Sequence, residues 1–237
     1  MKTAEGGFLK DDVSNYDSKE YQDPSVTVDF AVCSIIDFDL KVLLINRKYP
    51  PFKNYWAIPG GFVNVKNKES LEITAARELN EETGIKDIYL EQLKAYGDPD
   101  RDPRKRIITI VYFALIPFNE LSLQKIKADD DAKETQWFSL RNLSENLAFD
   151  HSKILYDLLN TIMIKILNSH IAFQLLSKEF TWSELQKVYE IILGKKLIAS
   201  NFRRKIKSLY VIKELSKMKK NTGRPAKLLT FIKQKEL

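Results

Sequence analysis

The fold of this chain is decided by the stretch Arg77-Glu78-Leu79-Asn80-Glu81-Glu82-Thr83-Gly84-Ile85, which Glu69 precedes by eight positions. Glu78, Glu81 and Glu82 are spaced i, i+3 and i+4, so on a helix they project from one face. Carboxylates crowded in this way repel one another unless solvent or a cation neutralises them. Mg²⁺ prefers one or two carboxylates together with substrate phosphates. We therefore expect Glu78 and Glu82 to bind Mg²⁺ or another divalent metal, while Arg77 pairs with a carboxylate.

With its flanks, this stretch resembles the Nudix box, the signature of hydrolases that cleave nucleoside diphosphates linked to another moiety. Tyr55–Gly61 resembles the strand and turn that lead into the box, and Gly84 stands where a left-handed residue ends its helix. The resemblance implies an α/β/α sandwich and a catalytic role for Arg77, Glu81 and Glu82. The competing interpretation is an ordinary surface helix with solvated acids.

One departure from the family pattern concerns the loop before the box helix. The pattern places a glycine six positions before Glu69, where this chain has Val63. The nearest glycine is Gly61, so we expect the loop 63–68 to be two residues longer than usual. In the family this loop helps to bind the metal, and its lengthening therefore bears on catalytic competence.

Net charge divides the chain into two parts. Residues 151–237 contain 18 Lys and Arg but 6 Asp and Glu, a charge of +12. The whole chain has 38 and 32, which leaves 20 and 26 for residues 1–150, a charge of −6. An acidic first part joined to a basic second part indicates two domains with different partners, the second a polyanion.

Hydrophobic patterning places the elements. Residues 25–36 and 39–47 are rich in Val, Ile, Leu and Phe and predict neighbouring strands; shorter strands are expected at 56–58, 88–96, 106–116 and 135–138, and a box helix at 69–83. Apolar residues at helical spacing predict a further helix near 154–167. We expect an N-terminal tail at 1–22, a Nudix domain at 23–148, a connecting helix at 149–172 and a second domain at 173–237.

Cysteine and charge usage indicate the compartment. The lone Cys33 lies among apolar strand residues, which predicts a buried thiol and excludes an internal disulfide. The most apolar stretch, 154–176, is interrupted by polar and charged residues too often for a membrane span. We therefore expect a cytoplasmic protein with no membrane partner.

A turn-rich loop precedes the strand predicted at 106–116. It reads Gly97-Asp98-Pro99-Asp100-Arg101-Asp102-Pro103-Arg104-Lys105-Arg106. Arg101 and Arg104 are suited to bidentate phosphate contacts. The loop resembles the R-D-P-R loop of Nudix proteins that recognise ADP-ribose and related NAD metabolites, although a solvated charged hairpin tip is the alternative. We expect Arg101 and Arg104 to bind the ligand together with Arg47, Gly60 and Gly61.

The second domain shows two helices joined by a short turn. Residues 182–193 read as an amphipathic helix that ends at Gly194. A second helix is expected near Asn201, capped by Ser200, with Phe202 and Ile206 facing inward. Its other face is polar and basic, which indicates a helix-turn-helix whose second helix enters the DNA major groove. The residues of this helix expected to contact DNA are Asn201, Arg203, Arg204 and Lys207.

A basic hairpin follows the second helix. The run from Ser216 to Phe231 has a basic tip, a glycine turn and an alternating strand, which together describe a wing. Residues 195–235 contain 14 Lys or Arg and a single acid, Glu214, a charge density that favours salt-dependent phosphate binding. The wing residues expected to contact DNA are Lys219, Lys220, Arg224 and Lys227.

The order of these motifs is itself informative. A Nudix domain followed by Phe180–Glu190, Asn201–Lys205 and Gly223–Leu228 resembles the Nudix-related transcriptional regulators of the NrtR type. This resemblance implies an α+β fold with a C-terminal winged helix-turn-helix. It also implies a homodimeric repressor that ADP-ribose, or a related NAD metabolite, releases from a double-stranded DNA operator.

Three alternatives stay open at this point. Related regulators sense pentose sugars, so the effector of this chain is either an ADP-ribose-like molecule or a sugar. A largely intact box favours a Mg²⁺-dependent pyrophosphatase, alone or combined with regulation. A Nudix-like interaction domain with a basic tail is the third alternative, against which the wing argues.

Overall fold

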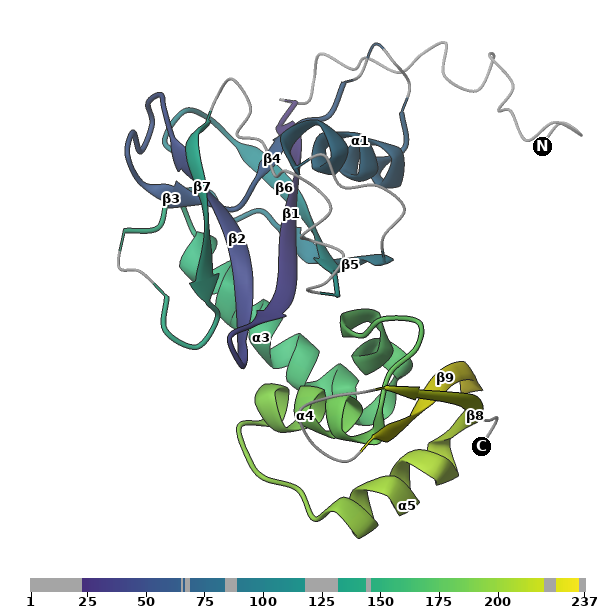
Figure 1. Cartoon of the computed structure of the whole chain (residues 1–237). Coiled ribbons are helices and arrows are strands. Elements are labelled where there is room, and N and C mark those ends of the chain that lie inside the picture. The colour runs from purple at the N-terminus through teal and green to yellow at the C-terminus, as the bar shows by residue number, and fades with distance from the viewer. Residues whose placement is uncertain are drawn as a thin grey trace, which may run out of the picture.

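The computed structural model describes residues 23–64, 66, 69–83, 89–117, 132–143, 146–219 and 225–234. Figure 1 shows two parts, a mixed sheet with helices and a smaller helical part with a two-stranded sheet, joined by the long helix α3 (His151–Asn168). The predicted tail at 1–22 and the predicted helix-ending Gly84 lie outside the described residues. Within the described chain, no helix is long and apolar enough to cross a membrane.

The first part is built on a seven-stranded sheet, counted over the described residues. Its strands are β1 (Ser25–Ile36), β2 (Asp39–Arg47), β3 (Trp56–Ala57), β4 (Gly60–Phe62), β5 (Tyr89–Tyr96), β6 (Ile107–Leu115) and β7 (Ala132–Ser139). β1 is the central strand: it runs parallel to β6 and antiparallel to β2 and β4. The bounds predicted for β1 and β2 are confirmed, whereas β4 was not predicted because three residues carry no readable alternation.

The two faces of the sheet are covered by different helices, because side chains alternate along each strand. Val28, Phe30 and Val32 of β1 belong to one buried cluster with Ala75 and Leu79 of α1 (Leu71–Thr83). Cys33 belongs to the other cluster, which includes the buried face of α3. The expected α/β/α sandwich is therefore confirmed, and burial raises the pKa of the Cys33 thiol and keeps it protonated.

Helix α3 links the two parts through one continuous core. Ile154 and Leu158 pack with the sheet, and Ile166 lies in the same cluster as residues of the second part. After α3 the chain forms the 3₁₀ helix η4 (His170–Leu175). Because α3 shares its apolar face with both parts, their relative position depends on side-chain packing along this helix.

The second part has the predicted winged helix-turn-helix order. It contains α4 (Trp182–Leu193), α5 (Ala199–Leu209), β8 (Tyr210–Lys219) and β9 (Ala226–Gln234). Thr181 and Glu184 form a capping box at the start of α4, and Gly194 ends α4 with φ of 68°. The prediction that Ser200 caps α5 is wrong: α5 begins at Ala199 with Ile198 at its N-cap and no side-chain cap, since the turn enters the helix earlier.

A candidate ligand pocket and a candidate nucleic-acid interface

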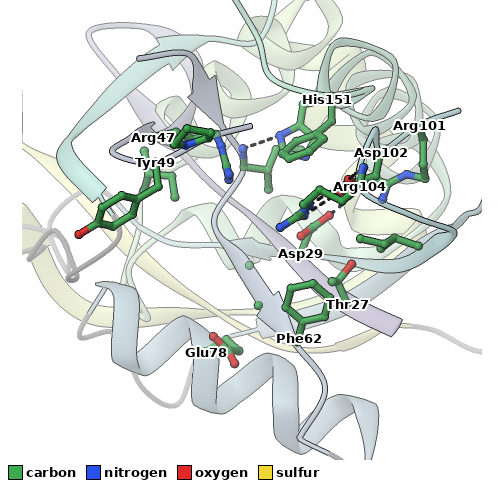
Figure 2. A pocket seen from close by; sticks show the side chains of 17 residues that line it. Thr27, Asp29, Arg47, Tyr49, Phe62, Glu78, Arg101, Asp102, Arg104 and His151 are labelled. Carbon is green, nitrogen blue, oxygen red and sulfur yellow. Dashed lines mark hydrogen bonds and ion pairs between the residues drawn. The ribbon is translucent and has the colours of Figure 1, made fainter. Parts of the chain in front are cut away.

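A cavity of about 370 Å³ is lined by residues of β1, β2, α1 and the start of α3. Figure 2 shows the side chains that line it. Its lining combines cationic, acidic and aromatic side chains with two glycines. The lining residues are Thr27, Asp29, Ile45, Arg47, Tyr49, Pro50, Ile58, Gly60, Gly61, Phe62, Glu78, Arg101, Asp102, Arg104, Ile107, Phe149 and His151. The structure thus brings together in one pocket all five residues predicted to bind the ligand and Glu78 of the box.

Two arginines lie against one aromatic ring in this pocket. The Cζ atom of Arg47 lies 4.9 Å from the centroid of the Phe149 ring, and that of Arg104 lies 5.7 Å from the same centroid. Arg104 also lies 5.6 Å from the centroid of Phe62. A ring face attracts a cation and orients it. The pocket therefore presents two oriented guanidinium groups beside two rings, an arrangement suited to an anionic ligand with a flat aromatic group.

The arginines of the loop before β6 differ in their partners. Arg101 donates to the Asp150 carboxylate from Nη2 at 2.8 Å and from Nε at 3.1 Å, and its side chain is 4% exposed. Arg104 donates to Asp102 at 2.7 and 3.0 Å, and its side chain is 42% exposed. Arg104 is therefore the more accessible of the two to a ligand, while the donors of Arg101 are directed at the start of α3.

Two buried titratable groups flank this loop. Burial raises the pKa of Asp29 to about 6, although the Thr109 hydroxyl donates to its carboxylate at 2.8 Å. Burial, followed by the charges of Arg101 and Arg47, lowers the pKa of His151 to about 3. The Nδ1 atom of His151 accepts from the Ile58 N–H at 2.9 Å. His151 is thus neutral at pH 7 and contributes a fixed polar ring to the pocket.

The box helix α1 supplies an acidic network centred on Arg77. Arg77 lies 3.0 Å from the carboxylate of Glu69, 3.0 Å from that of Glu78 and 2.8 Å from that of Glu81. The expected pairing of Arg77 with box carboxylates is confirmed. Of these carboxylates, Glu78 reaches the pocket, and burial raises its pKa.

Glu78 is the box carboxylate, among the described residues, that would be available to a divalent cation in the pocket. A Cβ on Gly61 would lie 2.5 Å from Glu78 Oε2, so the absence of that side chain lets the carboxylate approach the β4 backbone. A cation would stabilise the charged form that burial penalises. The side chain of Glu82 lies outside the description, as do residues 65, 67 and 68 of the loop 63–68. Among the described residues, no three His, Cys, Asp or Glu gather to hold a metal, so a bound ion would depend on ligand phosphates.

Sequence reasoning missed several lining residues. Phe149 and His151 lie more than sixty residues beyond the box, and Phe149 adopts φ of 52°, which no local pattern announces. Asp29 lies in β1 among mostly apolar residues, so the sequence pattern predicts a buried strand and does not indicate a site residue. Phe62 directly follows Gly60-Gly61 and could have been found, because a glycine turn beside a phosphate site brings its neighbours to the ligand.

The second part presents a basic helix. Phe202 and Ile206 are buried, as predicted, and Asn201, Arg203, Arg204 and Lys207 are exposed on α5. The charged ends of Arg203 and Lys207 lie within 5.8 Å of the Trp182 ring centroid. α5 therefore has the exposed cationic face that a recognition helix needs.

The wing residues have partners within the chain. Lys227 pairs with Glu214 at 2.9 Å, and Lys219 pairs with Glu184 of the α4 capping box. The predicted wing contacts Lys220 and Arg224 lie outside the described residues.

Comparison with known proteins matches both parts of the chain. A NUDIX domain model matches residues 26–158, and a model of the NrtR DNA-binding winged helix domain matches residues 172–231. The chain is 38% identical over 233 residues, 98% of this chain and 90% of the relative, to the "ADPR responsive transcriptional repressor NtrR" of Acinetobacter baylyi. It is 44% identical over 153 residues, 63% of this chain and 83% of the relative, to an ADP-ribose pyrophosphatase of Methanocaldococcus jannaschii.

The solved structures of Shewanella oneidensis NrtR give the same result. The structure complexed with a 27mer DNA matches with a TM-score of 0.76 and 34% identity, over 87% of this chain and 93% of that one. The NUDIX domain complexed with ADP ribose matches with a TM-score of 0.57 and 32% identity, over 65% of this chain and 99% of that one. With both domains matched in this order, the chain belongs to the Nudix-related transcriptional regulators of the NrtR type.

Proposed function

We propose that this protein is a transcriptional repressor whose Nudix domain binds ADP-ribose and thereby controls DNA binding by the winged helix. The observation that carries the proposal is the pair of guanidinium groups, Arg47 and Arg104, held against Phe149 in a cavity of about 370 Å³. A diphosphate supplies the charge that guanidinium groups bind bidentately. An adenine ring supplies a flat surface for Phe149 or Phe62.

The relatives support this ligand and this target. One is named an ADPR-responsive repressor, and another was solved both with DNA and with ADP ribose. A pentose sugar alone carries no anionic group, so it would leave Arg47 and Arg104 without a phosphate partner. The basic face of α5 supports double-stranded DNA as the second partner.

The route from ligand to DNA begins at the pocket wall. Phe149 lines the pocket, and His151, also in the wall, is the first residue of α3. The other end of α3 packs into the core of the winged helix. A ligand shifts the arrangement only if it binds one arrangement better than the other. We infer that ADP-ribose does so by contacting the start of α3.

The remaining partners follow from the same function. A dimer that reads two half-sites of a palindromic operator would match protein symmetry to DNA symmetry. Mg²⁺ held by Glu78 and Glu82 would neutralise the diphosphate in the pocket. Access to chromosomal DNA places the protein in the cytoplasm.

The test measures DNA binding against ligand concentration. An operator duplex selected from random-sequence DNA with the wild-type protein is titrated by fluorescence anisotropy at fixed salt, with and without ADP-ribose. AMP, ribose 5-phosphate and arabinose serve as controls. The expected result is release by ADP-ribose at concentrations at which the controls have no effect. An operator affinity that ADP-ribose leaves unchanged would refute the proposal, and release by arabinose would identify a sugar sensor.

Pyrophosphatase activity is a second candidate function, favoured by the contacts of Arg77 with the carboxylates of Glu69, Glu78 and Glu81. Here the Glu78 carboxylate would hold the metal, with Glu81 or Glu82 accepting a proton from the attacking water. AMP release from ADP-ribose with Mg²⁺, abolished in Glu78→Gln, would demonstrate hydrolysis. Hydrolysis would be excluded if ADP-ribose released the protein from its operator repeatedly while no AMP formed.

A further inference from the structure

Arg141 links the two parts of the molecule by hydrogen bonds. It lies in the turn that follows β7, in the Nudix part. Its Nη2 atom donates to the carbonyl oxygen of Ile192 at 2.5 Å and to that of Ile191 at 3.3 Å. Both carbonyls belong to the last turn of α4, the first helix of the helix-turn-helix.

The chemistry of a helix end explains this contact. The last four carbonyl groups of a helix have no partner inside it, and the C-terminus carries partial negative charge. Gly194 adopts φ of 68° and returns its N–H to the Glu190 carbonyl. A Cβ on Gly194 would lie 3.5 to 3.7 Å from the guanidinium of Arg141. Arg141 therefore lies directly against the turn that leads from α4 to α5.

A second contact joins the same end of the sheet to the same helix. The turn between β1 and β2 places Phe38 at φ of 60°, and the Lys187 ammonium of α4 lies 4.7 Å from its ring centroid. The N–H of Leu140 donates to the Leu40 carbonyl at 3.0 Å, which fastens the Arg141 turn beside the start of β2. Two adjacent turns of the Nudix part thus hold two points of α4.

We propose that Arg141 is a positioning residue for DNA recognition: it fixes the orientation of the helix-turn-helix on the Nudix domain without contacting DNA itself. The proposal rests on the proposed function in requiring that α5 binds DNA and that a dimer reads a two-fold operator. The relative complexed with a 27mer DNA and the structure of the same relative named without DNA both match over 87% of this chain with a TM-score of 0.76, so the orientation held by Arg141 is compatible with DNA binding.

Orientation matters because a two-fold operator has fixed half-site spacing. Half-sites lie about 34–36 Å apart, or multiples of that distance, so both recognition helices must point correctly at once. α3 packs against one side of α4 through apolar side chains. Such packing resists separation of the two helices more than rotation of one against the other. Arg141 and Phe38 add directional contacts elsewhere on α4. Removing the arginine should therefore leave the orientation of the helix-turn-helix less defined.

The experiment uses the full-length protein and the operator duplex selected with the wild type. Arg141→Ala, Arg141→Lys and the neighbouring control Asn142→Ala are compared by DNA affinity at fixed salt, by the salt dependence of that affinity, by ADP-ribose affinity without DNA and by melting temperature. Arg141→Ala should weaken operator binding about threefold to tenfold, the range that corresponds to the net free energy of one ordinary hydrogen bond. The salt slope and the ADP-ribose affinity should stay at wild-type values.

Three further variants test whether the loss comes from these contacts. Arg141→Lys keeps the charge at the helix end and should recover part of the loss, while Asn142→Ala should match the wild type. Phe38→Ala, which removes the second contact, should weaken binding in the same way, and it tests the proposal if Arg141→Ala fails to fold.

Two results would overturn the proposal. One is operator affinity within twofold of wild type for both Arg141→Ala and Phe38→Ala. The other is a salt slope reduced by about one in Arg141→Ala, since that would make Arg141 a direct phosphate contact. Failure of the proposed function would look different, because the wild type itself would then bind no operator or ignore ADP-ribose.

Discussion

Arg101 and Asp150 form a nearly buried bidentate ion pair that joins the pocket loop to the N-cap position of α3. The two hydrogen bonds measure 2.8 and 3.1 Å, and the side chains are 4% and 14% exposed. In the sequence Asp150 stands between Phe149 and His151, which both line the pocket, as does Arg101. The ligand site and the start of the connecting helix are therefore one structural unit.

Asp150→Ala should destabilise the fold by about 3–5 kcal/mol, because it leaves the Arg101 guanidinium buried without its main partner. Urea unfolding at pH 7 measures the change. Lys153→Ala is the matched control, since it breaks the exposed Lys153–Asp98 pair and should change stability little. Equal effects of the two substitutions would show that the Arg101–Asp150 pair does not stabilise the protein.

Arg104→Met should weaken ADP-ribose binding about tenfold or more, because it removes one exposed guanidinium from the pocket while keeping side-chain bulk. DNA affinity without ligand should not change, since Arg104 lies in the Nudix part. Isothermal titration calorimetry measures the ligand affinity. The control is Lys105→Met, because Lys105 is a neighbouring exposed cation outside the pocket lining. An equally large loss of ADP-ribose affinity in Lys105→Met would show that the overall charge of the loop, and not the Arg104 guanidinium, causes the effect.

Asp29→Asn should stabilise the protein at pH 7 but not at pH 4. Burial raises the folded-state pKa of Asp29 from 3.8 to about 6, so the stability that its protonated form contributes is full below pH 4 and is lost as the pH rises through 6. That change corresponds to about 3 kcal/mol at most. Parallel stability–pH curves for the variant and the wild type would contradict this assignment.

His151 has the opposite pH dependence. Its folded-state pKa is lowered from 6.5 to about 3, so the stability it contributes is full above pH 6.5 and is lost as the pH falls toward 3. The contributions of Asp29 and His151 therefore oppose each other between pH 4 and 6. In Asp29→Asn the opposing term is gone, and stability measured by urea unfolding should fall more steeply with acid than in the wild type.

Gly60→Ala and Gly61→Ala should separate stability from metal binding. A Cβ at Gly60 would lie 2.5 Å from the Val28 carbonyl oxygen, a backbone atom that cannot rotate away, so this variant should lose about 1–3 kcal/mol or more. A Cβ at Gly61 would meet the movable Glu78 carboxylate. Gly61→Ala should therefore keep its melting temperature while weakening Mg²⁺ binding in the presence of ADP-ribose. Unchanged Mg²⁺ affinity would argue against a metal at Glu78.

Arg203→Ala should lower the salt slope of operator binding by about one, because Arg203 is an exposed cation on α5 that would neutralise one phosphate. The substitution also removes the contact between Arg203 and the Trp182 ring, which should not affect ADP-ribose affinity. Lys53→Ala, an exposed cation in the loop between β2 and β3, should leave the slope unchanged. A slope unaffected by Arg203→Ala would remove this residue from the DNA interface.

The sequence by itself determined the order of elements and the chemistry of the box. Alternation in β1 and β2, the spacing of Arg77 and Glu78 and the inward stripe of α5 are local, because neighbours a few residues apart set them. Together with the resemblance of the box to the Nudix signature, these patterns predicted a Nudix fold followed by a winged helix. The spacing of the box placed Glu78 among the candidate site residues, and the resemblance to Nudix proteins that recognise ADP-ribose added Arg47 and Arg104.

Only the tertiary structure decided which distant residues meet. Phe149 and His151 complete the pocket because α3 packs back across the sheet, and Arg141 reaches α4 because two separate parts share one core. A pattern of hydrophobic residues fixes which face of an element is buried. It does not fix which buried faces pack together, since that choice depends on side-chain fit summed over the whole core.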